Sequence, residues 1–146
     1  MKYLYKNWIN ADLAVVILRV IVGIVFIAHG SQKVLGAFGG YGLEATVGYF
    51  AKNLGIPVFL GYVASFTEFF GGILLLVGFL TRPAALGIFI TMVVAFSVHL
   101  PSGFFLPNGF EYTFVLGFIA LIVLLFGAGE LSLDYYLSKK LEKEIE

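Results

Sequence analysis

Six ionisable residues interrupt or border the long apolar segments of this chain. They are Arg19, His29, Lys33, Glu68, His99 and Glu111. An ionisable group at membrane depth is costly, so it usually faces a bundle interior or a water-filled cavity and marks a function. Histidines and carboxylates together can bind a metal, relay protons, or hydrogen-bond the carbonyl oxygens of a quinone while exchanging its protons. A bis-histidine haem is a further alternative that no other haem signal supports. The spacing by itself does not choose among these chemistries.

The depths of these residues along their helices predict a cluster. At about 1.5 Å per residue, Arg19 lies about 10 Å and His29 about 26 Å from the start of their segment. Measured from the same side of the membrane, Glu68 lies about 21 Å in, His99 about 26 Å and Glu111 about 28 Å. We therefore expect two histidines and a glutamate from three helices at one level near the outer face, with Glu68 slightly deeper.

Each of these residues also has a purely structural interpretation. Arg19 could pair with a carboxylate for assembly, and Glu111, at a helix start, could complement the helix dipole. A single histidine near a helix end is often an interfacial hydrogen-bonding group. Glu68 is harder to explain in this way, because a carboxylate in the middle of a membrane helix has to be paired or protonated.

The composition places these residues in a lipid environment. Of the 146 residues, 60% are hydrophobic and only 12% are charged, against about 25% charged in a typical soluble domain. The formal net charge is zero, which gives no indication of nucleic-acid binding. The chain has no cysteine, which excludes disulfides, thiolate metal sites and dithiol redox chemistry within it. Any redox role would need a borrowed cofactor.

Four apolar segments provide the elements that would position the polar residues. With their flanks they approach the roughly 20 residues that cross a membrane as a helix, and none alternates as barrel strands do. We predict an all-α fold: one domain, residues 1–146, forming a four-transmembrane-helix bundle. The predicted spans are residues 12–33, 56–80, 83–100 and 111–129, followed by an amphipathic tail at 131–146.

A short amphipathic helix is predicted between the first two spans. The glycine-rich stretch Gly36–Gly42 precedes apolar residues at helical spacing, including Leu43, Val47 and Leu54. This pattern is typical of a helix that lies on the membrane surface.

The distribution of basic residues predicts the orientation of the bundle. One side of an even-numbered bundle would carry Lys2, Lys6, Arg82, Lys139, Lys140 and Lys143. The other side would carry only Lys33 and Lys52. Because basic residues favour the cytoplasmic side, we expect a multi-pass cell-membrane protein with both termini in the cytoplasm.

An ordered series of motifs resembles the DoxX family of small membrane proteins. It comprises Leu18-Arg19, His29-Gly30-x-Gln32-Lys33, Glu68-x-x-Gly71-Gly72, Thr81-Arg82-Pro83, His99, Asn108-Gly109-x-Glu111-Tyr112 and Gly127-Ala128-Gly129-Glu130. The resemblance spans residues 13 to 135 and implies a four-helix inner-membrane protein whose shared polar positions are the six residues above. Glu130 departs from the pattern, because relatives often carry a basic residue there.

The resemblance also extends to subunits of a thiosulfate:quinone oxidoreductase, which implies electron transfer into the quinone pool. On this hypothesis His29 and His99 bind the quinone carbonyls and Glu68 and Glu111 pass protons. Arg19 would hold Glu68 or anchor the bundle, and Lys33 would attract an anionic donor. A partner oxidoreductase subunit or a homo-oligomer would complete the system. The alternatives are a non-catalytic scaffold for a partner enzyme and a proton-coupled transporter of a small solute.

Overall fold

The computed structural model describes residues 10–145, and every regular element in that range is helical. The elements are α1 (Ala11–Leu35), the 3-10 turn η1 (Ala37–Gly39), α2 (Leu43–Leu54), α3 (Val58–Val77), α4 (Thr81–His99), the 3-10 turn η2 (Leu100–Ser102), α5 (Glu111–Phe126) and α6 (Leu133–Ile145). The all-α fold class is thereby confirmed. Lys2 and Lys6, which entered the orientation argument, lie outside the described residues.

Three helices, α1, α3 and α4, are long and apolar enough to cross a membrane. The fourth apolar helix, α5, has 16 residues and is therefore about 24 Å long, shorter than the roughly 20 residues expected of a span. A helix also forms at residues 43–54, between the first two spans, where the sequence predicts one.

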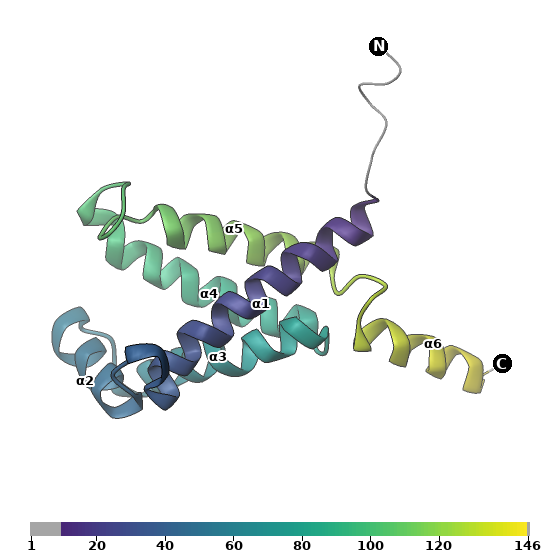
Figure 1. Ribbon diagram of the computed structural model, residues 1–146, viewed down its shortest axis with the longest axis horizontal. Coiled ribbons are helices and arrows are strands. Elements are labelled where there is room, and N and C mark those ends of the chain that lie inside the picture. Colours follow the sequence, from purple (N-terminus) through teal and green to yellow (C-terminus); the bar gives the residue numbers. More distant parts are fainter. Residues whose placement is uncertain (1–9, 146) are drawn as a thin grey trace, which may run out of the picture.

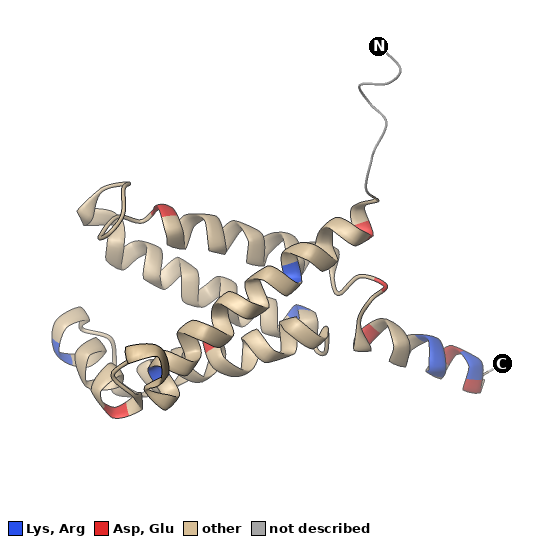
Figure 2. Cartoon of the chain, in the orientation of Figure 1, with Lys and Arg blue, Asp and Glu red and all other residues tan. Residues whose placement is uncertain are grey.

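The helices pack in two pairs that close into one bundle. α1 packs mainly on α3 and α4 mainly on α5, while α3–α4 and α1–α5 contacts join the pairs. Figure 1 shows α2 and the α4–α5 connection at one end of the bundle and α6 at the other. We call these the α2 end and the α6 end. Charged residues are concentrated toward the two ends, and α6 carries charges of both signs (Figure 2).

Glycines allow α1 and α3 to approach closely. A Cβ atom on Gly23 would lie 2.8 Å from the Leu76 backbone nitrogen, and one on Gly30 would overlap the backbone of Phe69. Small residues at such positions permit backbone contact between membrane helices. The approach decides which side chains of the two helices become neighbours.

The interior is apolar and so is much of the outer surface. The core contains fully buried Val22, Leu75, Ile88 and Val123, whereas large apolar side chains such as Ile24 are exposed. A soluble protein rarely exposes so many large apolar residues, and lipid is the environment that suits them.

α3 ends three residues before the predicted limit of its span. Gly78 adopts a left-handed conformation with φ of 70° and donates its N–H to the carbonyls of Leu74 and Leu75. This is a common helix C-terminus, and glycine favours it because it lacks a Cβ. A Cβ on Gly78 would also lie 2.7 Å from the Arg19 guanidinium, so the same glycine makes room for that side chain.

Candidate functional site

Arg19 lies at the α6 end and binds backbone carbonyls there. Its guanidinium donates to the carbonyls of Leu75, of Leu76 at 2.9 Å and of Leu131 at 2.7 Å, and the residue is 1% exposed. The carbonyls in the last turn of a helix lack intrahelical partners and carry partial negative charge. Arg19 therefore joins the end of α3 to the segment before α6, as in the anchoring interpretation, and the structure gives it no contact with Glu68.

Glu68 pairs instead with Lys33. The Lys33 ammonium donates to the Glu68 carboxylate, and their side chains are 25% and 4% exposed. The close approach at Gly30 and Phe69 brings this part of α1 against the turn of α3 that carries Glu68. A buried carboxylate is strongly unfavourable unless it is paired or protonated, and Lys33 provides the pairing charge.

His29 extends this polar group to α5. Its Nε2 lies 3.1 Å from the Tyr112 hydroxyl oxygen, within hydrogen-bond distance, and the two ring centroids are 5.8 Å apart. His29 precedes Lys33 by four residues, so both side chains lie on the same side of α1. We call His29, Lys33, Glu68 and Tyr112 the polar group. It draws side chains from three helices at the α2 end.

His99 and Glu111 lie at the same end of the bundle but have other partners. His99 Nδ1 hydrogen-bonds to the Asn108 carbonyl oxygen at 2.9 Å, and the Glu111 carboxylate accepts the Leu106 N–H at 2.9 Å. Both bonds shape the connection between α4 and α5. Within residues 10–145, no hydrogen bond or ion pair joins them to the polar group. Depth along a helix gives height in the membrane, whereas contact also requires the right direction around the helix axis.

A cavity of about 560 Å³ opens beside Lys33. It lies between the end of α1, the turn after it and α2. Its lining residues are Gln32, Lys33, Gly39, Gly40, Tyr41, Ala45, Thr46, Tyr49 and Phe50. Gly40 allows this cavity to form. Its backbone packs directly on the backbone of Gln32, so the chain turns back over α1. We call this space the outer cavity, after the side of the membrane on which the basic residues predict this end to lie.

The aromatic lining was not predicted as part of a site. Tyr41 precedes the predicted amphipathic helix, and Tyr49 and Phe50 lie within it, where aromatic residues are expected at a membrane interface in any case. The Lys33 ammonium lies 6.0 Å from the centre of the Phe50 ring. The available sequence signal was the series of aromatic residues in the segment that follows Gln32 and Lys33, which the fold brings next to them.

The chemistry available at the α2 end is that of hydrogen bonding and proton transfer. Among the described residues, no three His, Cys, Asp or Glu side chains come together in a way that could hold a metal ion. The polar group offers an ammonium, a carboxylate, an imidazole and a phenol, all groups that can donate, accept or relay a proton.

An all-helical bundle with lipid-compatible surfaces and a polar group at one end defines the class: a small helical membrane protein. The comparison with protein families is specific, since the model of the DoxX family matches residues 14–100. The chain belongs to the DoxX family.

Relatives match over nearly the whole chain. A Bacillus subtilis protein named "Putative oxidoreductase CatD" is 33% identical over 129 residues, covering 88% of this chain and 90% of its own length. The Escherichia coli inner membrane protein YqjF is 32% identical over 136 residues, with 88% and 95% covered. The Mycobacterium tuberculosis membrane protein Rv3486 is 34% identical over 143 residues, with 87% and 83% covered. No solved structure gave a significant match.

Proposed function

We propose that this chain is the membrane subunit of an oxidoreductase system and binds a quinone or another small redox substrate at the α2 end. The observation that carries the proposal is the Lys33–Glu68 ion pair, which lies where the outer cavity meets the bundle interior. Membership of the DoxX family and the oxidoreductase name of one relative support the same class of function.

The outer cavity has the groups that a quinone head group needs. Lys33 and Gln32 offer N–H donors for a carbonyl oxygen, and the aromatic rings of Tyr49 and Phe50 offer apolar faces for a planar ring. Glu68 and His29 would supply the two protons that reduction of a quinone to a quinol takes up, and a partner oxidoreductase subunit would supply the two electrons. In this proposal His99 and Glu111 shape the neighbouring connection, because their hydrogen bonds are made there.

The proposal includes a placement in the membrane. α5 serves as the fourth span, short enough to need local thinning of the bilayer or support from α4. α2 lies at the outer interface, and α6 lies in the cytoplasm with Arg82, Lys139 and Lys140 at the same end. The clustering of basic residues at the α6 end supports this orientation (Figure 2).

Quinone retention tests the proposal. The full chain, purified from quinone-containing membranes in mild detergent, should retain quinone that solvent extraction and chromatography can quantify. Lys33→Met should lower the affinity for added quinone about tenfold or more, because a hydrogen bond to a charged donor contributes about 1.5–3 kcal/mol. Lys52→Met is the matched control, since Lys52 is also on the α2 side but does not line the outer cavity. A wild-type protein that neither retains nor binds quinone would refute the quinone assignment.

A second candidate function, a scaffold for a partner enzyme, is favoured by α6. This helix stands apart from the other helices in Figure 1 and exposes Leu137 and Leu141. Its charged side chains pair with one another: Lys139 donates to Glu142 at 3.0 Å, and this hydrogen bond raises the pKa of Lys139. Removal of residues after 132 should abolish recovery of an oxidoreductase partner in the scaffold case and leave quinone binding intact.

A further inference from the structure

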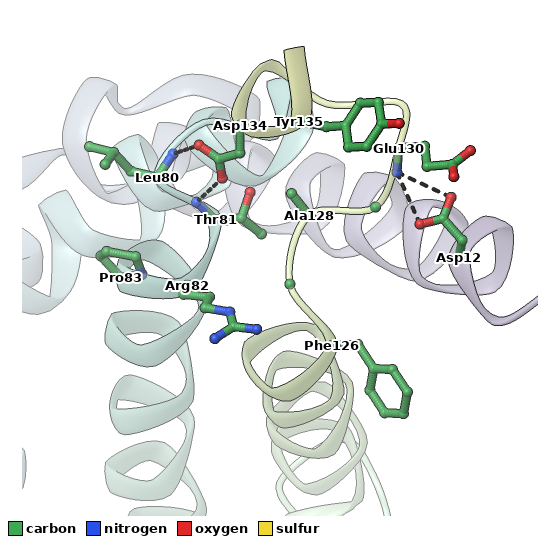
Figure 3. Close-up of a pocket in the computed structure, with 12 residues that line it drawn as sticks. Asp12, Leu80, Thr81, Arg82, Pro83, Phe126, Ala128, Glu130, Asp134 and Tyr135 are labelled. Atoms are coloured by element: carbon green, nitrogen blue, oxygen red, sulfur yellow. Dashed lines mark hydrogen bonds between the residues drawn. The ribbon is translucent and has the colours of Figure 1, made fainter. Parts of the chain in front are cut away.

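A second cavity, of about 650 Å³, lies at the α6 end, far from the polar group along the bundle. It is formed where the start of α4, the end of α5 and the segment leading to α6 meet, as Figure 3 shows. We call it the inner cavity. The proposed redox function makes no use of it.

Arg82 is the only lysine or arginine among the residues that line the inner cavity. Its side chain reaches from α4 toward the end of α5 (Figure 3). Across residues 10–145 no carboxylate forms an ion pair with it. Arg82 therefore presents a planar guanidinium with several free N–H donors to the cavity, an arrangement that suits a phosphate group.

Thr81 provides a second, independent indication of a ligand. The residue is 1% exposed and lines the inner cavity, yet its hydroxyl oxygen has no hydrogen-bond partner among the described residues. Buried hydroxyl groups are nearly always hydrogen-bonded, because an unsatisfied one is destabilising. A ligand in the cavity that accepts from Thr81 and Arg82 together would remove this deficit. The positive end of the α4 dipole lies at the same position.

Three carboxylates also line the inner cavity, and two of them accept hydrogen bonds from backbone N–H groups. The Asp134 carboxylate accepts the N–H groups of Leu80 and Thr81, each at 2.9 Å. The Asp12 carboxylate accepts the N–H of Glu130 at 3.0 and 3.1 Å. The Glu130 side chain is the remaining one, and it is exposed and can turn toward water. All three carboxylates keep their charge and oppose binding of an anion, but the hydrogen bonds from backbone N–H groups offset part of the charge of Asp12 and Asp134.

The apolar part of the lining favours a phospholipid over a soluble anion. Phe126 and Leu80 line the cavity and are 64% and 49% exposed, and Pro83 lies beside them. They stand at the ends of apolar helices, where the head groups of a bilayer would lie. Basic side chains beside the head groups attract anionic lipids, and Arg82 supplies such a charge at this cavity. We propose that the inner cavity binds a phosphate group, which an anionic phospholipid supplies, through Arg82 and Thr81.

The test measures binding of phosphatidylglycerol, phosphatidylcholine and inorganic phosphate to the full-length protein in detergent. Binding is read from the rise in the melting temperature of the protein as the concentration of each compound increases. We expect phosphatidylglycerol to bind best. Arg82→Gln and Thr81→Val should each weaken it about tenfold, Thr81→Ser should restore binding, and Glu130→Gln should strengthen it. Lys143→Gln, which removes an exposed cation of α6 outside the cavity, is the control.

The outcomes separate the two sources of phosphate. Saturation by inorganic phosphate alone, with the same dependence on Arg82 and Thr81, would support the phosphate site with a soluble anion as its occupant. Binding that is unchanged in Arg82→Gln, or lost equally in Lys143→Gln, would overturn the proposal. If Arg82→Gln does not fold, Thr81→Val, which alters no charge, decides in the same way. Quinone binding at the α2 end is measured separately and does not depend on this result.

Discussion

Lys33 and Glu68 form an ion pair in which one partner is buried and the other is partly exposed. The carboxylate is almost fully buried and the ammonium is a quarter exposed, so the cavity reaches only the cation. Such pairs contribute little net stability compared with apolar residues, but breaking one leaves an uncompensated buried charge. The pair therefore adds little to the net stability, and in the proposed function its role would be proton or substrate chemistry.

We predict that Lys33→Met destabilises the protein by roughly 3 kcal/mol, the lower part of the range for breaking a buried pair, because Lys33 is partly exposed. The double variant Lys33→Met/Glu68→Leu should recover most of this loss, since no buried charge remains. Denaturant unfolding in detergent, followed by circular dichroism, measures both. Equal stability of the single variant and the wild type would show that the pair is not buried as described.

At the scale of the helices, the α1–α3 contact places the polar group. Gly30 lies directly against the backbone of Phe69, next to Glu68, and one turn before Lys33. Any side chain at residue 30 would force the two helices apart and separate the ion pair. The position of the polar group thus depends on a residue that has no side chain.

We predict that Gly30→Ala lowers stability by about 1–3 kcal/mol through overpacking and also weakens any ligand binding at the outer cavity. Gly48→Ala is the matched control, because it also lies in a helix but has nothing within 4 Å of an added Cβ. There the change should be neutral or stabilising by about 1 kcal/mol, given the higher helix propensity of alanine. Thermal unfolding of both variants distinguishes a packing effect from a general effect of alanine; similar losses at the two sites would contradict the close contact.

At the scale of the whole molecule, the two ends of the bundle differ in kind. The α2 end has a buried ion pair, a histidine and an aromatic cavity, whereas at the α6 end arginine, aspartate and backbone groups join the helix termini. In the proposed topology these two ends would lie on opposite sides of the membrane.

The absence of cysteine allows a direct test of orientation. Single variants Asn53→Cys on α2 and Ser138→Cys on α6 can be labelled with a membrane-impermeant thiol reagent in intact cells. We expect labelling at residue 53 from outside and at residue 138 only after the membrane is opened. The reverse pattern would invert the proposed topology, and labelling of both from one side would contradict an even number of spans.

The sequence alone determined the helical membrane class and the approximate limits of the helices, because apolar runs of membrane length have few alternatives in lipid. It also identified Lys33 and Glu68 as candidate site residues, because charged residues within or beside apolar segments are easily recognised. The side-chain contacts of these residues could not be predicted from the sequence. Depth placed His29, Glu68, His99 and Glu111 toward one end, but the rotation of each helix about its axis decided which of them touch.

That rotation is a property of tertiary packing. The glycine contacts between α1 and α3 turned Lys33 toward Glu68, and the turn at Gly40 folded the aromatic residues over Lys33. Arg19, which looked like a candidate partner for Glu68, instead binds the end of α3, because Gly78 leaves room for its guanidinium there. Composition and periodicity determine that a helix forms and which environment it suits; only the fit of side chains between helices decides which polar groups meet.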